Sequence, residues 1–152
     1  MNKTFCLVTG ISPDKIQKGL ASAEGHILKD APDLAVYMQF MRTSMLQERI
    51  SDITEIFWKN PITMEETLND IPSDILTRRG KVVIIQSFLK DHVFAIMRGI
   101  KSVSSRPQDI IFAMLTETAA TWTLEEYLKH LKAEHSYMKT HPPEHDADMR
   151  RM

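Results

Sequence analysis

The sequence predicts an all-α protein, a single-domain bundle of five to seven helices. Three observations support this fold class. Apolar residues recur at intervals of three and four in several segments, which is the spacing of one helix face. Proline residues and capping-box sequences stand where helices would begin. The segment 81–100 is apolar on almost every side, which predicts a central, buried helix.

The first part of the chain predicts two helical segments after a short apolar stretch. Residues 5–8 allow an optional short strand. Ser12-Pro13 has the residue types of a helix N-cap and a first helical position, and apolar residues follow at helical spacing. A second helical segment opens near Pro32 and could extend to Trp58. One of its two apolar stripes comprises Leu34, Met38, Met41 and Met45.

The middle of the chain contains a helix start and the proposed central helix. Thr63 followed three residues later by Glu66 forms a capping box, which predicts a short helix. The segment 81–100 follows as the central helix of the bundle. Its beginning, Val82-Val83-Ile84-Ile85, would by itself also fit a strand, because a short apolar run does not distinguish a buried strand from a buried helix.

A second capping box marks the last helix. Thr123 and Glu126 have the capping-box spacing, and Trp122 and Tyr127 occupy the two positions of a hydrophobic staple. A cap of this kind is worth about 1 kcal/mol of stability. The sequence therefore predicts a final helix that starts immediately after Thr123.

Composition limits the domain organisation and the cellular location of the protein. We expect one helical domain over residues 1–139 and a flexible, charged C-terminal tail over residues 140–152. No apolar run approaches the roughly 18 residues that a membrane-spanning helix needs, and the first residues lack the apolar core of a secretory signal. A single cysteine, Cys6, excludes an internal disulfide. We expect a cytoplasmic protein without a membrane partner.

The sequence offers no local catalytic or metal-binding motif, so we expect no catalytic residue, no metal and no cofactor. Four histidines lie late in the chain, but His130 and His135 are five residues apart, a poor spacing for chelation on a helix. His92 lies on the apolar stripe of the central helix. A helical-bundle ligand-binding protein or enzyme built around His92 is one alternative reading.

The methionine content suggests a binding surface. The chain has 10 methionines in 152 residues, and three of them share the stripe that Leu34 begins. Methionine is flexible and polarisable, so it lines adaptable binding surfaces as well as irregular cores. We therefore expect a non-enzymatic, intracellular interaction or regulatory protein that binds a protein partner, or a second copy of itself, through an apolar helical face. The candidate residues are Leu34, Met38, Met41 and Met45.

Charge is distributed unevenly along the chain although the net charge is only -1. Residues 48–74 hold seven acidic and two basic residues, whereas residues 78–106 hold seven basic residues and one acidic residue. Arg78, Arg79 and Lys81 could supply a contact with an acidic partner at the rim of the binding face. Internal pairing of the two segments is the favoured explanation. The alternative function is a nucleic-acid-binding transcriptional regulator that uses residues 78–106 and the last two helices.

Overall fold

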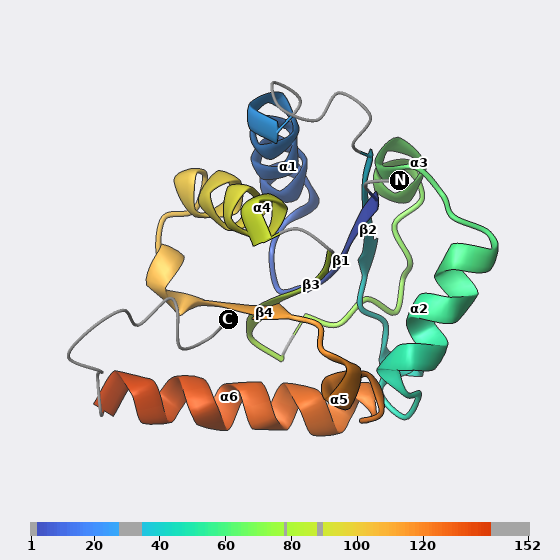
Figure 1. Ribbon diagram of the computed structural model, residues 1–152, viewed down its shortest axis with the longest axis vertical. Helices are drawn as coiled ribbons and strands as arrows, with labels where there is room; N and C mark the ends of the chain where they lie inside the picture. The colour runs from blue at the N-terminus through green and yellow to red at the C-terminus, as the bar shows by residue number, and fades with distance from the viewer. Residues whose placement is uncertain (1–2, 28–34, 78, 88–89, 141–152) are drawn as a thin grey trace.

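The protein has a mixed α/β fold, in which helices cover both faces of a four-stranded sheet, so the all-α prediction is wrong (Figure 1). The computed structural model describes residues 3–27, 35–77, 79–87 and 90–140. The predicted C-terminal tail lies outside these residues, apart from Thr140. Strands from both halves of the chain form one sheet.

The sheet consists of two parallel pairs joined by an antiparallel pair. Its strands are β1 (Lys3–Thr9), β2 (Ala35–Phe40), β3 (Lys81–Gln86) and β4 (Ile110–Met114), in the spatial order β2-β1-β3-β4. Strand β1 runs parallel to β2, β3 runs parallel to β4, and the central strands β1 and β3 are antiparallel. The chain therefore forms two βαβ units, β1-α1-β2 and β3-α4-β4.

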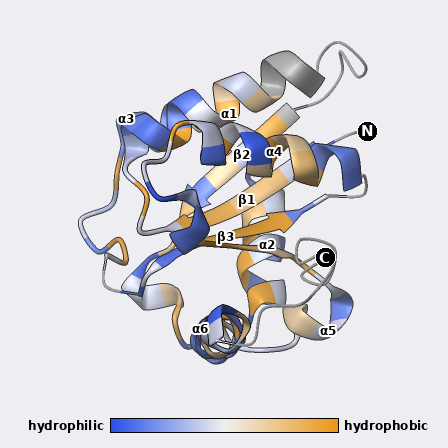
Figure 2. Ribbon diagram, turned by 90° about the vertical axis from the view of Figure 1, so that its left-hand side faces the viewer, coloured by the Kyte–Doolittle hydropathy of each residue, from blue (hydrophilic) through white to orange (hydrophobic). Residues whose placement is uncertain are grey.

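Helices form a layer on each face of the sheet. Helices α1 (Pro13–Ile27) and α4 (Lys90–Ser102) share one apolar core with the sheet, and α2 (Ile50–Lys59) and α6 (Leu124–Thr140) share the other. Figure 2 shows the apolar strands between helices that carry hydrophilic outer sides. The remaining elements are short: α3 (Met64–Asn69), α5 (Glu117–Ala120) and the 3-10 turns Thr43–Met45 and Pro107–Asp109.

The predicted central helix over residues 81–100 is instead strand β3 followed by helix α4. The run Val82-Val83-Ile84-Ile85 is the core of β3, and all four side chains are buried. A central strand that is covered on both faces is apolar at every position, so it lacks the alternation by which a strand is recognised. The optional strand near residues 5–8 is present and forms β1.

The predicted helix from Pro32 to Trp58 is also incorrect over most of its length. Residues 35–40 form β2, Thr43–Met45 form a 3-10 turn, and only the last part is helical, as α2. Met38 packs into the core on the α1–α4 side of the sheet, whereas Met41 and Met45 pack into the core on the opposite side. Their helical spacing therefore does not reflect a shared face.

The helix starts agree with the capping signals. Thr63 accepts a hydrogen bond from the Glu66 backbone N–H at 3.1 Å, and the Glu66 carboxylate reaches back to the Thr63 N–H, so the capping box is complete. Thr123 likewise accepts from the Glu126 backbone N–H at 3.2 Å. The rings of Trp122 and Tyr127 meet edge to face at 6.0 Å, as in a hydrophobic staple. Local signals of this kind remain valid although the fold class was wrong.

Two pairs of glycines bring backbone segments unusually close together. Helices α1 and α4 cross at Gly19 and Gly99, where a Cβ on Gly99 would overlap the carbonyl oxygen of Gly19. Gly10 has φ +78° and lies against the backbone of Gly80, which has φ +80°. Only glycine adopts this left-handed conformation without strain. These contacts fix how the two βαβ units pack against each other.

Candidate functional site

The two edges of the sheet differ in how they are covered. At the β2 edge, the Thr67 hydroxyl donates to the Met38 carbonyl oxygen at 3.1 Å. Just beyond β2, Leu76 N–H donates to the Met41 carbonyl at 2.9 Å, and Thr43 N–H donates to the Asp74 carbonyl at the same distance. The segment that contains α3 and the following loop therefore covers this edge, as natural sheets commonly arrange.

At the other edge, β4 pairs with β3 on one side and with no described strand on the other. Leu115 N–H donates to the Ile85 carbonyl at 2.8 Å. Since backbone groups alternate in direction along a strand, Ile111 and Ala113 also direct their N–H and C=O groups toward β3. Phe112 and Met114 lie between them and direct both groups away from β3. Among residues 3–27, 35–77, 79–87 and 90–140, no backbone group forms a hydrogen bond with these outward groups.

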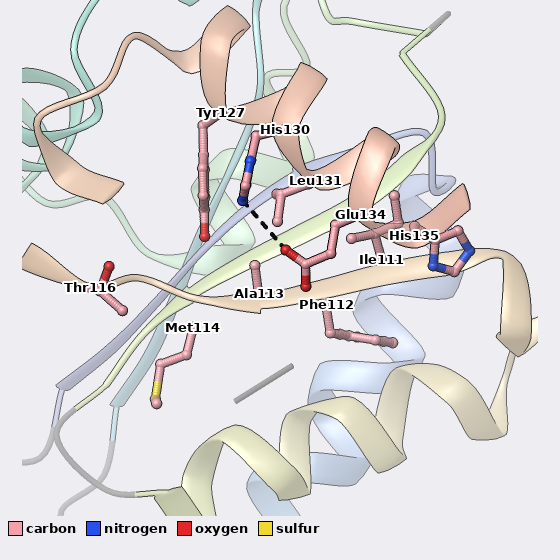
Figure 3. A pocket seen from close by; sticks show the side chains of 10 residues that line it. All are labelled: Ile111, Phe112, Ala113, Met114, Thr116, Tyr127, His130, Leu131, Glu134 and His135. Carbon is pink, nitrogen blue, oxygen red and sulfur yellow. Dashed lines mark ion pairs between the residues drawn. The ribbon is translucent and has the colours of Figure 1, made fainter. Parts of the chain in front are cut away.

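A cavity of about 120 Å³ lies along this edge, between β4 and α6 (Figure 3). In Figure 3, side chains of α6 reach down toward β4. Consecutive residues of β4 line it, which places backbone as well as side chains at its wall. The lining residues are Ile111, Phe112, Ala113, Met114, Thr116, Tyr127, His130, Leu131, Glu134 and His135.

Polar groups of α6 border this cavity. His130 Nε2 lies 3.4 Å from a Glu134 carboxylate oxygen, and both side chains are about half exposed. Burial, and secondarily the charge of Glu134, raise the pKa of the Tyr127 phenol, so the hydroxyl keeps its proton at neutral pH. The site therefore combines apolar side chains, a phenol and a paired histidine and carboxylate beside the outward-facing backbone groups of β4.

The end of α6 is fixed to the beginning of β4. Lys139 Nζ lies 3.3 Å from the Asp109 carboxylate, and its hydrogen bond lowers the pKa of Asp109. At the other end of α6, hydrogen bonds from Arg79, at 3.1 Å, and from Gln47 lower the pKa of Glu125. These contacts hold α6 antiparallel to β4 and set its position along the strand.

Cys6 lies in the central strand β1 and is fully buried, which raises the pKa of its thiol to about 12. A thiol with so high a pKa is not a nucleophile at neutral pH. We expect a thiol reagent such as dithionitrobenzoate to leave the native protein unmodified and to react with one thiol per chain after unfolding in guanidinium. Rapid modification of the native protein would contradict the burial of Cys6.

The structure does not bring the predicted binding residues together on a surface. Met38 and Met41 are 0% exposed and Met45 is 7% exposed, so these side chains belong to the core. Leu34 and Arg78 lie outside the described residues. Arg79 pairs with Glu125 of α6, which is not part of the acidic segment 48–74, and Lys81 is half-buried at the start of β3.

Other candidate groups do not form a site either. His92 is buried in the first turn of α4. Within the described ranges, no three histidine, cysteine or acidic residues lie close enough to hold a metal ion. A second cavity, of about 310 Å³, lies beside α2, but Arg42 at its rim is bound to Asp74 at 2.8 Å. Within the same ranges, no helix has the length and apolar character needed to cross a membrane.

The sequence reasoning missed the β4–α6 site, although two signals for it are present. Residues 110–115, Ile-Ile-Phe-Ala-Met-Leu, are apolar and uncharged, which is typical of a strand prone to pairing. On α6, polar and aromatic residues recur at helical spacing beside the apolar stripe.

Part of the chain matches a known family. Residues 81–138 match the model of a family described as a domain of unknown function, DUF3783. The match covers a little over a third of the chain, from the first residue of β3 to near the end of α6, and includes every residue that lines the β4–α6 cavity. No curated protein and no solved structure matches the chain. The chain is thus similar to this family over its second βαβ unit and helix α6.

Proposed function

We propose that this chain is a protein-association module that binds by adding a strand of another polypeptide to the outer edge of β4, where no described strand pairs. The observation that carries this proposal is that Phe112 and Met114 direct their backbone N–H and C=O groups outward, beside the β4–α6 cavity. In this mode of recognition, main-chain hydrogen bonds supply affinity and neighbouring pockets supply specificity.

The energetics favour a short, apolar segment as the ligand. Each hydrogen bond to an outward group of β4 contributes about 0.5–1.5 kcal/mol net. Strand β4 has no lysine, proline or bulge, the devices by which natural edge strands avoid pairing. Apolar side chains of the added strand would extend the cores that Ile111 and Phe112 already enter on the two faces of the sheet.

Replacing Met114 with proline tests the proposed function. The Met114 N–H points away from β3, so proline removes an outward donor and leaves the hydrogen bonds between β3 and β4 in place. The matched control is Met114→Ala, which truncates the same side chain but keeps the N–H. A random library of ten-residue peptides displayed on phage is selected on the wild type and then compared on the two variants. We expect the selected peptides to be apolar and to bind Met114→Ala much more strongly than Met114→Pro.

A second variant covers the case in which Met114→Pro fails to fold. Glu134→Trp leaves β4 unchanged and fills the cavity from α6, where Glu134 is about half exposed. We expect it to reduce peptide binding while its thermal unfolding stays close to that of the wild type. Peptides that bind all three variants equally, or a selection that enriches no peptide on the wild type, would contradict the proposal.

A further inference from the structure

The two halves of the chain are built alike. A strand, a helix, a second strand and a second helix follow one another as β1-α1-β2-α2 in residues 3–59 and as β3-α4-β4-α6 in residues 81–140. We call these segments the first repeat and the second repeat. In both, a short helical turn precedes the second helix, as Thr43–Met45 in one and as α5 in the other. The family match begins at the first residue of the second repeat.

The buried residues of the helices correspond position by position. In both α2 and α6, four buried residues follow one another at steps of three, one and three, beginning at Ile50 and at Leu124. In α1, each buried apolar residue has a buried counterpart in α4 at a constant distance of 77 positions. These pairs are Ile16 and Val93, Leu20 and Met97, and Ala23 and Ile100.

A two-fold axis relates the repeats. At the beginnings of α2 and α6, Ile50 N–H donates to the Trp122 carbonyl at 3.0 Å, and Leu124 N–H donates to the Glu48 carbonyl at 2.9 Å. Exchanging the repeats converts each of these bonds into the other. The central strands β1 and β3 are antiparallel, as the same axis requires. Reciprocal contacts of this kind are those of a unit paired with its equal.

The repeats also agree where the chain leaves the outer strand. Met41 N–H donates to a carbonyl of β1 at 2.7 Å, and Leu115 N–H donates to a carbonyl of β3 at 2.8 Å. The next residue is extended in both repeats, with φ -119° and ψ 152° at Arg42 and φ -105° and ψ 165° at Thr116. We call the three residues centred on Arg42 the first corner and the three centred on Thr116 the second corner.

The first corner is bound by an extended segment of the chain itself. Leu76 N–H donates to the Met41 carbonyl, and Thr43 N–H donates to the Asp74 carbonyl, both at 2.9 Å. The segment 74–76 therefore runs antiparallel to the first corner, as the bridge between its middle residue and the corner also shows.

Side chains of the bound segment enter the cores on both faces of the sheet. Ile75 packs against the core on the α1–α4 side, and Leu76 is buried in the core on the α2–α6 side. Arg42 Nε donates to the Asp74 carboxylate at 2.8 Å. An aliphatic pair preceded by an acid is thus the chemistry that the first corner binds.

The second corner is less buried than the first. Met41 and Phe40 are 0% and 3% exposed, whereas their counterparts Leu115 and Met114 are only half-buried. Over the ranges that the structure describes, no backbone group bonds to the Leu115 carbonyl or to the N–H of Glu117, the counterparts of the two groups that hold the segment 74–76. The exposed surface at the second corner is thus the surface that this segment covers at the first.

The repeat relation also applies to the outward groups of the strands. Phe112 of β4 corresponds to Met38 of β2, since each pairs with the equivalent residue of its central strand. In the first repeat, the Met38 carbonyl accepts a hydrogen bond from the Thr67 hydroxyl of α3. The chain between the repeats therefore uses both the outer edge and the corner of the first repeat.

We propose that the second corner binds an extended segment of a partner protein in the way that the first corner binds residues 74–76. This inference rests on the proposed function and specifies the end of the added strand. The partner segment runs antiparallel to the second corner and carries two successive aliphatic residues. Because Leu76 lies on the α2–α6 side of the sheet, its counterpart in the partner points toward the β4–α6 cavity, which Met114 and Thr116 line.

Two peptides and two variants test the second corner. One synthetic peptide has the sequence of residues 70–77, Asp-Ile-Pro-Ser-Asp-Ile-Leu-Thr, and the other has asparagine in place of Asp74. Thr116→Arg gives the second corner the arginine of the first. Thr116→Gln is the matched control, because it removes the same threonine cap from α5 without adding a charge. Proton–nitrogen correlation spectra measure binding of both peptides to the wild type and to both variants.

We expect the aspartate peptide to shift the amide signals of Leu115 and Glu117 and to leave those of the first corner unchanged. Thr116→Arg should bind the aspartate peptide about two- to fivefold more tightly than the asparagine peptide, which is the usual effect of a partly exposed ion pair. The wild type and Thr116→Gln should bind the two peptides about equally. Absence of shifts at the second corner, or equal binding of both peptides by Thr116→Arg, would overturn the inference. Titration of the wild type needs no variant and decides the case in which Thr116→Arg does not fold.

The outcomes separate this inference from the proposed function. If library peptides bind in a manner blocked by Met114→Pro but the aspartate peptide does not shift the second corner, strand addition is retained and this inference is rejected. If the aspartate peptide binds at the second corner but no library peptide depends on the Met114 N–H, the corner contact is retained and strand addition along β4 is rejected.

Discussion

Met41→Asp is expected to unfold the protein. Met41 is 0% exposed, and its backbone N–H and carbonyl bond to Val8 and Leu76 at 2.7 and 2.9 Å. The substitution removes a buried apolar side chain and places a carboxylate in a cluster of apolar side chains. We expect a loss of more than about 4 kcal/mol, which is a large part of the 5–15 kcal/mol by which a domain is usually stable.

Circular dichroism and urea unfolding of Met41→Asp and a Met41→Leu control test this expectation. The leucine variant keeps the apolar volume and should lose less than about 1.5 kcal/mol. A folded Met41→Asp protein that no longer associates with its partner would show instead that Met41 is part of a docking surface, as the methionine pattern suggested. Because Met38 and Met41 enter the cores on opposite faces of the sheet, only the unfolding result is consistent with the fold.

Gly99→Ala should destabilise the protein although alanine favours helices. In an ordinary helical position, alanine is about 1 kcal/mol more favourable than glycine. At Gly99 the added methyl group would overlap the Gly19 carbonyl oxygen and come within 3.3 Å of Ala23 Cβ. Since the overlap involves backbone, helices α1 and α4 would have to separate, and we expect a net loss of about 2–4 kcal/mol.

Thermal and urea unfolding of Gly99→Ala check this value. Arg98→Ala, at the neighbouring exposed position of α4, serves as the control and should change stability by no more than about 0.5 kcal/mol. An increase in stability for Gly99→Ala would contradict the close crossing of α1 and α4, and with it the packing of the two βαβ units.

Local sequence signals predicted where helices begin, but not which segments are strands. Thr63 and Thr123 act within a few residues, so their capping role does not depend on the rest of the fold. The conformation of Val82–Ile85, by contrast, depends entirely on the rest of the fold. Because helices cover both faces of this strand, it needs no polar position, and its apolar pattern resembles that of a buried helix. The placement of helices on both sides of β3 is long-range information that a single sequence does not display.

The candidate site was hidden for a similar reason. The helical spacing of Tyr127, His130 and Glu134 is readable in the sequence, but their position at a cavity beside β4 depends on the fold. That the segment near Thr67 covers the β2 edge, and that no described strand pairs with the outer side of β4, follows only from the order of strands in the sheet. Sequence spacing could therefore identify these residues of α6 without showing what they face.

Amide hydrogen exchange along β4, measured with and without a selected peptide, tests the central claim most directly. The N–H groups of Ile111 and Ala113 face β3 and should be protected in both states, whereas those of Phe112 and Met114 should exchange faster in the free protein and become protected when the peptide binds. Protection of Phe112 and Met114 that rises together with the fraction of protein that is bound is the predicted result. Exchange at these two amides that stays the same with and without bound peptide would contradict strand addition at the β4 edge.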